Sequence, residues 1–328
     1  MKLGRSELEV SRLTLGTWAF AGGQIWGEQE RRESVSTVHA ALDAGINFFD
    51  TAPAYGAGKS EEVLGEALQG RRGEAVIATK VSTRQQGREA LLKSCEESLA
   101  RLKTDYIDLL QVHWPSPDVP FREIVATFAE LKHAGKIRYA GVCNFSARDI
   151  SRWLDAGGEM VTNQLPYSLL TRAIEFEIIS ACEKRGIATL PYSPLMQGLL
   201  TGKFRTADDV PDGRSRSRHF RPDRPMARHG EPGCEGETFA AIKKVEEIAA
   251  SAGQPMDAVS LAWILAQPTV GSVVFGARTV EQLKANIRGM EIELSSETVS
   301  ELTKATEAVK DLLGANPDIW ENPSRFNL

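Results

Sequence analysis

The stretch Gly45-Ile-Asn-Phe-Phe-Asp-Thr-Ala-Pro-Ala-Tyr-Gly56 contains the features that decide the fold. Its first glycine follows Ala44 at the end of a helical pattern, where glycine is common because it adopts left-handed backbone conformations. The apolar run after it predicts a short buried strand over Phe48–Asp50, and a polar side chain closes that run. The stretch therefore predicts a helix end, a strand and a loop that carries polar groups.

The same plan recurs outward from this stretch along almost the whole chain. Most strand ends lie 28 to 34 residues apart, which is about the length of one βα unit. Eight such units favour a closed barrel over an open sheet, because open parallel sheets usually have fewer strands. The predicted strands are Leu13–Leu15, Phe48–Asp50, Val76–Thr79, Ile107–Val112, Tyr139–Cys143, Val161–Gln164, Ala188–Tyr192 and Val273–Phe275.

Helical patterns separate these strands, so we expect an α/β fold, a single (β/α)8 TIM barrel domain over residues 1–328. Three additions are predicted: an N-terminal β-hairpin at 1–12, a lid-like loop at about 197–237 after strand 7, and a C-terminal tail at about 312–328. The predicted helices include Glu33–Ala44, Ser60–Leu68, Glu89–Leu102, Phe121–Ala134, Ile150–Leu154, Phe176–Arg185, Phe239–Ser251 and Met256–Leu265.

Composition and charge argue against several classes of protein. The 328 residues are 42% hydrophobic and 25% charged, which is typical of a globular domain. A net charge of -5 predicts no nucleic-acid or membrane partner, and no apolar run approaches the length of a membrane span. The four cysteines lack metal-ligand and CxxC spacing, which indicates reduced thiols, no bound metal and a cytoplasmic location. We expect a small-molecule partner; a homo-oligomer stays open and is not predicted.

Ionisable side chains close three of the predicted strands. Asp50, Lys80 and His113 end strands 2, 3 and 4, and Tyr55 follows Asp50 in the loop. Taken singly each is ambiguous, because a strand-end aspartate is often a helix cap and a lone histidine is often a core group. In a barrel, however, the carboxyl ends of all strands meet at one mouth, where catalytic groups come from different strands. We therefore expect the four side chains to form one site.

Together these four groups suit the reduction of a carbonyl. Tyr55 can supply the proton, and the Lys80 ammonium is expected to lower the pKa of its phenol. Asp50 would keep the lysine charged and in place, while His113 would donate a hydrogen bond to the carbonyl oxygen. The hydride must come from a cofactor, because no side chain can supply it.

The sequence around these residues resembles the aldo-keto reductase family, in particular the bacterial branch near inositol-catabolism reductases and potassium-channel β subunits. The resemblance covers about residues 1–310 and implies a barrel that binds NADPH or NADP+, with NADH at lower affinity, and transfers the 4-pro-R hydride to a carbonyl compound. The matching motifs are the opening stretch, Ser60-Glu-Glu62, Leu64-Gly65, Ile77-Ala-Thr-Lys80, Asp105-Tyr-Ile-Asp-Leu109 with His113, Gly135-Lys-Ile-Arg138 and Gly141-Val-Cys-Asn-Phe-Ser146.

The resemblance also implies cofactor and substrate contacts. Tyr192 would stack on the nicotinamide, Asn144 and Gln164 would bind its carboxamide, and Arg278 would pair with the 2′-phosphate. Substrate contacts are expected from Trp18, Tyr55, His113 and Trp114. The full set of cofactor residues is Thr17, Trp18, Asp50, Asn144, Gln164, Tyr192, Ser193, Pro194, Leu195, Gly198, Lys203, Gly276, Arg278, Gln282 and Asn286.

Three hypotheses follow. The first is an NADP-dependent reductase of aldehydes or ketones of sugar or cyclitol type; the second is a redox-sensing regulatory subunit that binds NADPH with little turnover. The channel β subunits carry Asn at the position of His113, so the histidine favours turnover. A barrel isomerase without nicotinamide is disfavoured, because Lys80, Tyr55 and Gln164 would then lack roles. The arginines of loop 205–229 are open to three readings: solvation, a subunit contact or an acidic substrate.

Overall fold

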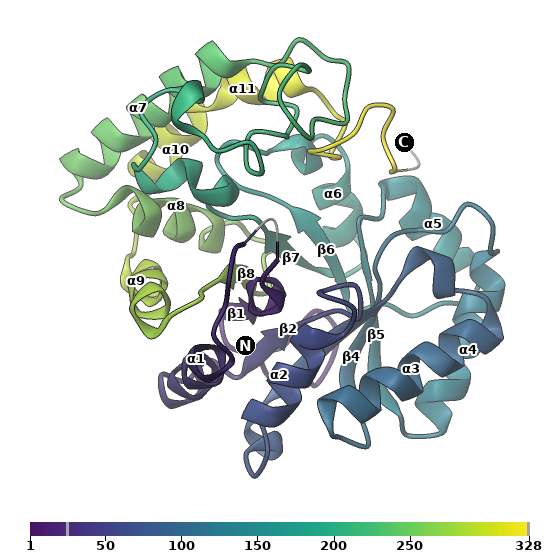
Figure 1. Ribbon diagram of the computed structural model, residues 1–328. Helices are drawn as coiled ribbons and strands as arrows, with labels where there is room; N and C mark the ends of the chain where they lie inside the picture. Colours follow the sequence, from purple (N-terminus) through teal and green to yellow (C-terminus); the bar gives the residue numbers. More distant parts are fainter. Residues whose placement is uncertain (24–25, 327–328) are drawn as a thin grey trace.

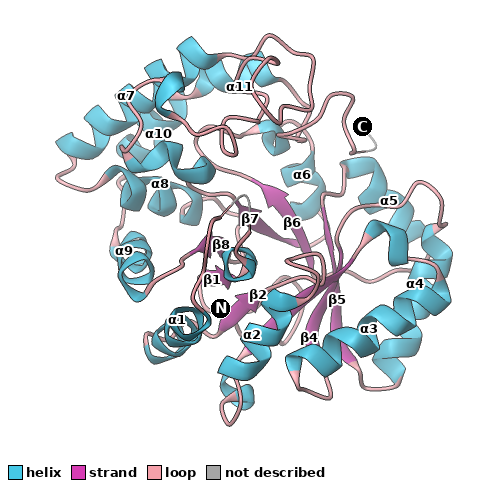
Figure 2. Cartoon of the chain, viewed as in Figure 1, coloured by secondary structure: helices cyan, strands magenta, loops and turns pink. Residues whose placement is uncertain are grey.

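Eight parallel strands close into a barrel in the order β1 to β8 (Figures 1 and 2). The structure is a computed structural model that describes residues 1–23 and 26–326. All eight predicted strands are confirmed, three of them with the predicted ends. The strands are β1 Leu13–Gly16, β2 Phe48–Asp50, β3 Val76–Val81, β4 Ile107–Val112, β5 Ile137–Cys143, β6 Thr162–Pro166, β7 Ala188–Tyr192 and β8 Val273–Gly276.

Helices surround the barrel as the repeated plan predicts. The α-helices are α1 Arg31–Asp43, α2 Lys59–Ala67, α3 Arg88–Leu102, α4 Phe121–His133, α5 Ala147–Asp155, α6 Ile178–Glu183, α7 Glu235–Ser251, α8 Met256–Leu265, α9 Val280–Glu291, α10 Ser296–Ala305 and α11 Glu307–Leu313. Short 3-10 helices lie at Trp18–Ala21, Arg72–Glu74, Thr83–Gln85, Ala173–Glu175, Met196–Thr201 and Ala207–Asp209. In the part of the chain that the structure describes, no helix combines the length and apolar character needed to cross a bilayer.

The predicted N-terminal hairpin closes the bottom of the barrel. Lys2 and Glu9 form an antiparallel bridge, which brings Leu3, Leu8 and Val10 under the strands. These three side chains are buried in one cluster with residues that point into the barrel from β2, β3, β4, β7 and β8. Apolar burial at this end leaves the opposite end of the barrel, where the strands finish, for polar groups.

The strand register places the candidate residues at that mouth. Asp50, the last residue of β2, pairs with Gly16, the last residue of β1, and with Ala78 of β3. Lys80 lies two residues further along β3 and pairs with Gln111 of β4. The side chains of alternate strand residues point into the barrel, so Lys80, two residues beyond the Asp50 partner Ala78, faces the interior as Ala78 does and meets Asp50 there.

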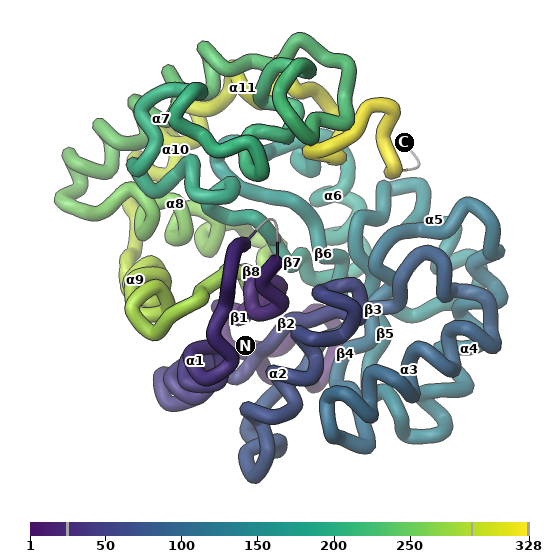
Figure 3. Tube along the Cα trace, in the orientation of Figure 1, coloured from purple at the N-terminus to yellow at the C-terminus, as the bar shows by residue number. Residues whose placement is uncertain are grey.

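The interval between β7 and β8 departs most from the repeated plan. Residues 202–234 form a long loop with one 3-10 turn, followed by α7, and α10 and α11 lie beside α7 (Figure 1). Figure 3 shows the tail after α11 running next to this loop. The buried Arg218 of the loop donates to the Leu313, Asn316 and Asp318 carbonyls at 2.8, 2.8 and 3.3 Å and pairs with Glu231 at 2.6 Å. The loop is therefore an ordered layer tied to the tail; residues 327–328 of the predicted tail lie outside the described residues.

Candidate active site

The four ionisable groups expected to converge do so at the barrel mouth. The Lys80 ammonium donates to Asp50 Oδ1 at 2.6 Å, to the Thr51 carbonyl at 2.8 Å and to the Tyr55 hydroxyl at 3.3 Å. Asp50 and Lys80 are almost completely buried. A buried ammonium is stable only with such partners, because an unpaired charge inside a protein costs several kcal/mol. Lys80 therefore links the carboxylate to the phenol.

His113 completes the group from the end of β4. Its ring lies edge-on to the Tyr55 ring with 6.1 Å between the centroids. Burial, with smaller effects of the Lys80 and Arg325 charges, lowers the pKa of His113 to about 3. The imidazole is therefore neutral at ordinary pH, so that one ring nitrogen can donate a hydrogen bond while the other accepts.

The expected direction of the Tyr55 pKa shift is wrong. Burial raises the pKa of the phenol to about 12, although the nearby Lys80 charge acts in the opposite direction. For Lys80 itself burial is the largest single influence and lowers the pKa, but its surroundings, foremost the Asp50 carboxylate, leave the pKa raised. Burial could not be read from the sequence, which explains the error. Tyr55 is thus protonated and Lys80 is charged over the whole ordinary pH range.

Amide side chains hold the carboxylate and the mouth in place. Gln164 Nε2 donates to Asp50 Oδ2 at 2.8 Å, and Gln111 Nε2 reaches the same oxygen at 3.4 Å. Asn144 Nδ2 donates to the His113 carbonyl at 3.0 Å, and its Oδ1 accepts from the Tyr192 hydroxyl at 3.0 Å. Gln164, Asn144 and Tyr192 therefore lie at the strand ends beside Asp50 and His113; their contacts with a nicotinamide stay a prediction.

A cavity of about 660 Å³ opens above these groups, a size in the usual range for small-molecule sites. Trp18 lines it and stacks on Tyr55 with 5.6 Å between the ring centroids. Trp114 lines it beyond His113. The predicted residues that also line it are Asp50, Tyr55, His113, Asn144, Gln164, Tyr192, Ser193, Pro194, Leu195, Gly198, Lys203, Gly276, Arg278, Gln282 and Asn286.

Thr17, predicted as a cofactor contact, does not line the cavity. Its side chain is completely buried. Its hydroxyl contacts Ser60 Oγ at 2.7 Å and donates to the Asp50 carbonyl at 3.0 Å. Thr17 therefore ties β1, β2 and the start of α2 together beneath the site, because a hydroxyl next to another strand end finds partners there and not in the cavity.

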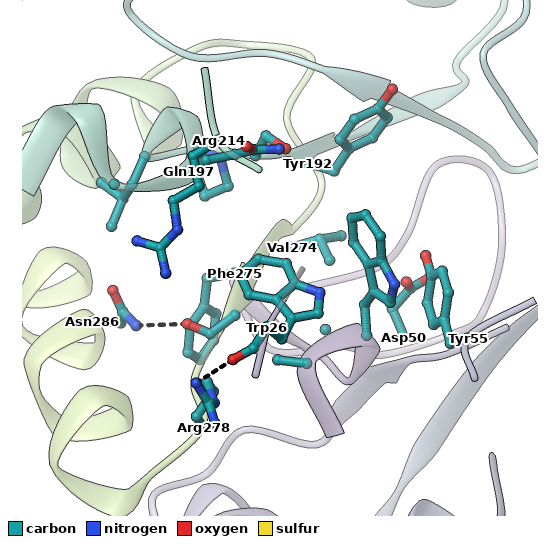
Figure 4. A pocket seen from close by; sticks show the side chains of 18 of the residues that line it. Trp26, Asp50, Tyr55, Tyr192, Gln197, Arg214, Val274, Phe275, Arg278 and Asn286 are labelled. Carbon is teal, nitrogen blue, oxygen red and sulfur yellow. Dashed lines mark hydrogen bonds between the residues drawn. The ribbon is translucent and has the colours of Figure 1, made fainter. Parts of the chain in front are cut away.

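Two basic side chains face the far end of the cavity without acidic partners. Lys203 and Arg214 form no ion pair with any residue in 1–23 or 26–326, and burial together with the Arg214 charge lowers the pKa of Lys203. Figure 4 shows the Arg214 guanidinium pointing into the space between Gln197 and Asn286, away from Asp50 and Tyr55. Gly198, at φ +95°, leaves room for the Lys203 ammonium, which a β-carbon there would strike. Such a cationic recess suits phosphate groups.

Arg278 lies at the same end but has protein partners. Its guanidinium donates to the Trp26 carbonyl at 2.6 Å, to Gln29 Oε1 at 2.7 Å and to the Glu28 carbonyl. It therefore holds the loop between β1 and α1 against the start of α9, as Figure 4 shows for Trp26. The guanidinium expected to pair with the 2′-phosphate is thus already bonded to the protein, although an arginine has five N–H groups and some remain for a phosphate.

Several lining residues were missed by sequence reasoning: Trp26, Gln197, Arg214, Trp320 and Arg325. They lie in the loops after β1 and β7 and in the tail, where no periodic pattern fixes their position. A signal for Arg214 was present in the arginine-rich run 214–224, but nothing in the run distinguished it from Arg218, which is buried as a structural clamp. Among the described residues no group of His, Cys, Asp and Glu could hold a metal ion.

A (β/α)8 barrel with an Asp–Lys–Tyr–His group at its mouth, of which Asp50 and Lys80 are buried, defines the class of protein. The model of the Aldo/keto reductase family matches residues 12–307, and the chain belongs to this family. It is 36% identical over 330 residues to aldo-keto reductase YhdN of Bacillus subtilis (strain 168), a match that covers 97% of this chain and 96% of that protein.

Two further similarities concern the cofactor. The chain is 34% identical to the NADH-specific methylglyoxal reductase of Escherichia coli (strain K12), covering 94% of this chain and 98% of the relative. It also superposes on the crystal structure of an aldo/keto reductase from Klebsiella pneumoniae in complex with NADP and acetate, with a TM-score of 0.72 and 28% identity. That match covers 90% of this chain and 91% of the other. Fold and family make this chain an oxidoreductase that acts on small molecules.

Proposed function

We propose that this chain reduces an aldehyde or ketone to the alcohol with NADPH, with Tyr55 as the general acid. The observation that carries the proposal is the Lys80 ammonium, which contacts both the Asp50 carboxylate at 2.6 Å and the Tyr55 hydroxyl at 3.3 Å. That arrangement couples a proton donor to a fixed positive charge. A proton delivered by a positioned side chain contributes roughly 10²–10⁴-fold to such a reaction.

Each side chain then has one task. Tyr55 gives its hydroxyl proton to the carbonyl oxygen, and the Lys80 charge stabilises the phenolate that remains. Asp50 keeps Lys80 charged and in place, supported by Gln164. The neutral His113 donates a hydrogen bond to the same carbonyl oxygen and orients it toward Tyr55. In the direction of alcohol oxidation Tyr55 must first lose its proton, and the phenolate, stabilised by Lys80, then accepts the proton of the alcohol.

The residues present fit a nicotinamide cofactor. The unpaired Lys203 and Arg214, the recess at Gly198 and the buried Gln197 Oε1, which has no hydrogen-bond partner among the described residues, lie together at one end of the cavity. Tyr192 provides a flat ring at the other end. When bound, the nicotinamide supplies the hydride. Lys203 and Arg214 would hold its phosphates, Ser193, Pro194 and Leu195 would follow its ribose, and Gln282 and Asn286 would meet the adenine.

We infer a preference for NADPH over NADH. Arg214 and Arg278 approach the adenosine end from opposite sides, and two guanidinium groups there favour the extra 2′-phosphate. The Klebsiella pneumoniae neighbour is in complex with NADP, which supports this preference. The Escherichia coli relative is NADH-specific by name, so both cofactors belong in the test.

The test is a panel of aldehydes, ketones, sugars and polyols, followed at 340 nm in both directions with each cofactor. We expect turnover of at least one carbonyl compound with NADPH and slower or weaker turnover with NADH. The expectation of a sugar- or cyclitol-type substrate is decided by the same panel. Cofactor binding by fluorescence without turnover of any compound would instead favour a regulatory subunit, and no binding of either cofactor would overturn both proposals.

A further inference from the structure

We propose that Arg325 forms an anionic subsite at the mouth of the cavity and that the chain selects carbonyl compounds carrying a carboxylate. The inference rests on the proposed function, because it names the substrate class of that same site. Arg325 and Trp320 both line the cavity from the C-terminal tail, although the tail lies far in sequence from the catalytic strands.

The tail is built rigidly around one buried carboxylate. Asp318 Oδ1 accepts hydrogen bonds from the Trp320 and Glu321 amides at 3.1 and 3.2 Å, and Oδ2 accepts from the Arg325 amide at 3.2 Å. The Arg325 side chain adds a bidentate contact, Nε to Oδ2 at 2.7 Å and Nη2 to Oδ1 at 2.8 Å. Arg218 holds the same turn from the loop side. Arg325 is therefore a fixed group, and little side-chain entropy remains to be lost on binding.

The remaining nitrogen of this guanidinium is available to a ligand. Nη1 has no hydrogen-bond partner among residues 1–23 and 26–326, whereas Nε and Nη2 are bonded to Asp318. The guanidinium carbon lies 3.9 Å from the centre of the Trp114 ring, and Phe326 packs edge-on to the same ring at 5.4 Å. Stacking on a flat ring fixes the plane of the guanidinium, which gives the free N–H groups a defined direction.

The surrounding charges leave room for one more negative group. Asp318 balances Arg325, and Glu321, 3.6 Å from Arg325, is shared with Arg228 at 3.5 Å. Arg216 stacks on Trp320 at 4.5 Å, has no acidic partner in the described part of the chain, and buries an unbonded Nε. A single carboxylate would accept a hydrogen bond from the free Arg325 nitrogen, and its negative charge would balance the positive charge of Arg216. A phosphate dianion would need more donors than this end of the cavity offers.

The position of Trp114 sets the shape of the substrate. Trp114 follows His113 in the sequence and carries the Arg325 guanidinium on its ring, so the carbonyl position at Tyr55 and His113 and the Arg325 subsite border the same cavity. Trp18 and Trp320 add further aromatic wall. A flat or extended spacer between the two groups fits these walls, as in a formylbenzoate.

The test compares 4-carboxybenzaldehyde with methyl 4-formylbenzoate, which differ only in the charge at the far end. The wild-type chain should favour the acid by roughly 10- to 100-fold in kcat/KM, the range of a charge-assisted hydrogen bond. Arg325→Gln keeps a donor for Asp318 but removes the charge, and should lower kcat/KM for the acid by most of this factor, with a much smaller fall for the ester. Arg325→Lys should restore part of the preference for the acid.

Arg228→Gln serves as a matched control, and benzoate binding tests the Arg325 subsite without turnover. Arg228→Gln removes an exposed charge that also contacts the tail but does not line the cavity, and should leave the preference intact. Benzoate should quench tryptophan fluorescence in an Arg325-dependent way, with benzamide far weaker. No preference in the wild type, or an equal fall for acid and ester in Arg325→Gln, overturns the subsite. Arg325-dependent benzoate binding without any aldehyde turnover would uphold it and overturn the proposed function alone.

Discussion

The two ends of the cavity satisfy their polar groups in opposite ways. At the catalytic end the protein itself supplies the partners, because Lys80 binds Asp50, Thr51 and Tyr55 while Gln164 binds Asp50. At the other end, where we propose that the cofactor binds, Lys203 and Arg214 line the cavity and pair with no acidic residue in the described part of the chain.

The difference shows what each end does before a ligand arrives. Internal partners fix the reacting groups in advance, so no reorganisation is needed during the reaction. Unpaired cations side by side repel each other, and an anion between them removes that repulsion. The end with Asp50, Lys80 and Tyr55 is therefore preorganised, while the proposed cofactor end has cations that a bound anion would pair. Arg325 combines both states in one side chain, with two nitrogens bonded and one free.

The largest expected effect on stability is at the catalytic end. Lys80→Met leaves the Asp50 carboxylate buried without its counter-charge, and breaking a buried pair costs about 3–5 kcal/mol in the free energy of unfolding. Lys132→Met is the matched control, because its pair with Glu159 at 2.8 Å is exposed and should contribute about 0–1 kcal/mol. Denaturant unfolding measures both. Equal small losses would show that the Asp50–Lys80 pair does not hold the catalytic end together.

The effect at the cofactor end should be seen in binding and not in stability. Arg214→Ala should weaken NADPH by roughly 10- to 100-fold, the range for a hydrogen bond to a charged group, and should weaken NADH less. Arg205→Ala, in the same loop but paired with Glu246 on the surface, should change neither affinity. Fluorescence titration gives the dissociation constants. An unchanged NADPH affinity in Arg214→Ala would contradict the proposal that Arg214 binds the cofactor.

The smallest effect compares a partly buried histidine of the barrel, His113, with a fully buried one of the loop, His219. Burial, above all other influences, lowers the pKa of His113 to about 3 and that of His219 to about 4. Below pH 6.5 the unfolded chain binds protons at these residues and the native chain does not, so stability falls with falling pH until the native pKa is reached. Each histidine contributes a loss of about 1.4 kcal/mol per pH unit in that window.

Substitution isolates the contribution of the loop. His219→Gln should reduce the slope of the free energy of unfolding against pH, between about pH 4 and 6.5, by about 1.4 kcal/mol per pH unit, the contribution of one histidine. The measurement is urea unfolding across that window in parallel with the wild-type chain. A slope identical to that of the wild type would mean that His219 titrates in the native protein, and that the loop is less tightly packed against Leu170 than the 2.7 Å contact indicates.

The sequence was informative where the structure is local and periodic. Glycine-ended helices and short apolar runs predicted all eight strands, and barrel geometry then brought Asp50, Lys80 and His113 together. Arg218 shows the limit, because its contacts with residues 313, 316 and 318 join segments almost a hundred residues apart. No pattern in the chain marks such contacts. The predictions of a lowered Tyr55 pKa and of Thr17 in the cavity lining were wrong for a related reason, because both depend on how the side chains pack.

The proposed function depends most directly on Tyr55 as the proton donor. The decisive measurement is single-turnover oxidation of bound NADPH at 340 nm with a carbonyl compound accepted by the wild-type chain, repeated with Tyr55→Phe and with Tyr139→Phe. Tyr139 of β5 serves as the control. Its hydroxyl accepts a hydrogen bond at 3.2 Å from the amide of Glu7, which belongs to the N-terminal hairpin below the barrel. We predict a fall of roughly 10²–10⁴-fold in Tyr55→Phe, with nearly unchanged NADPH affinity, and no change in Tyr139→Phe. Substantial turnover by Tyr55→Phe would contradict the account.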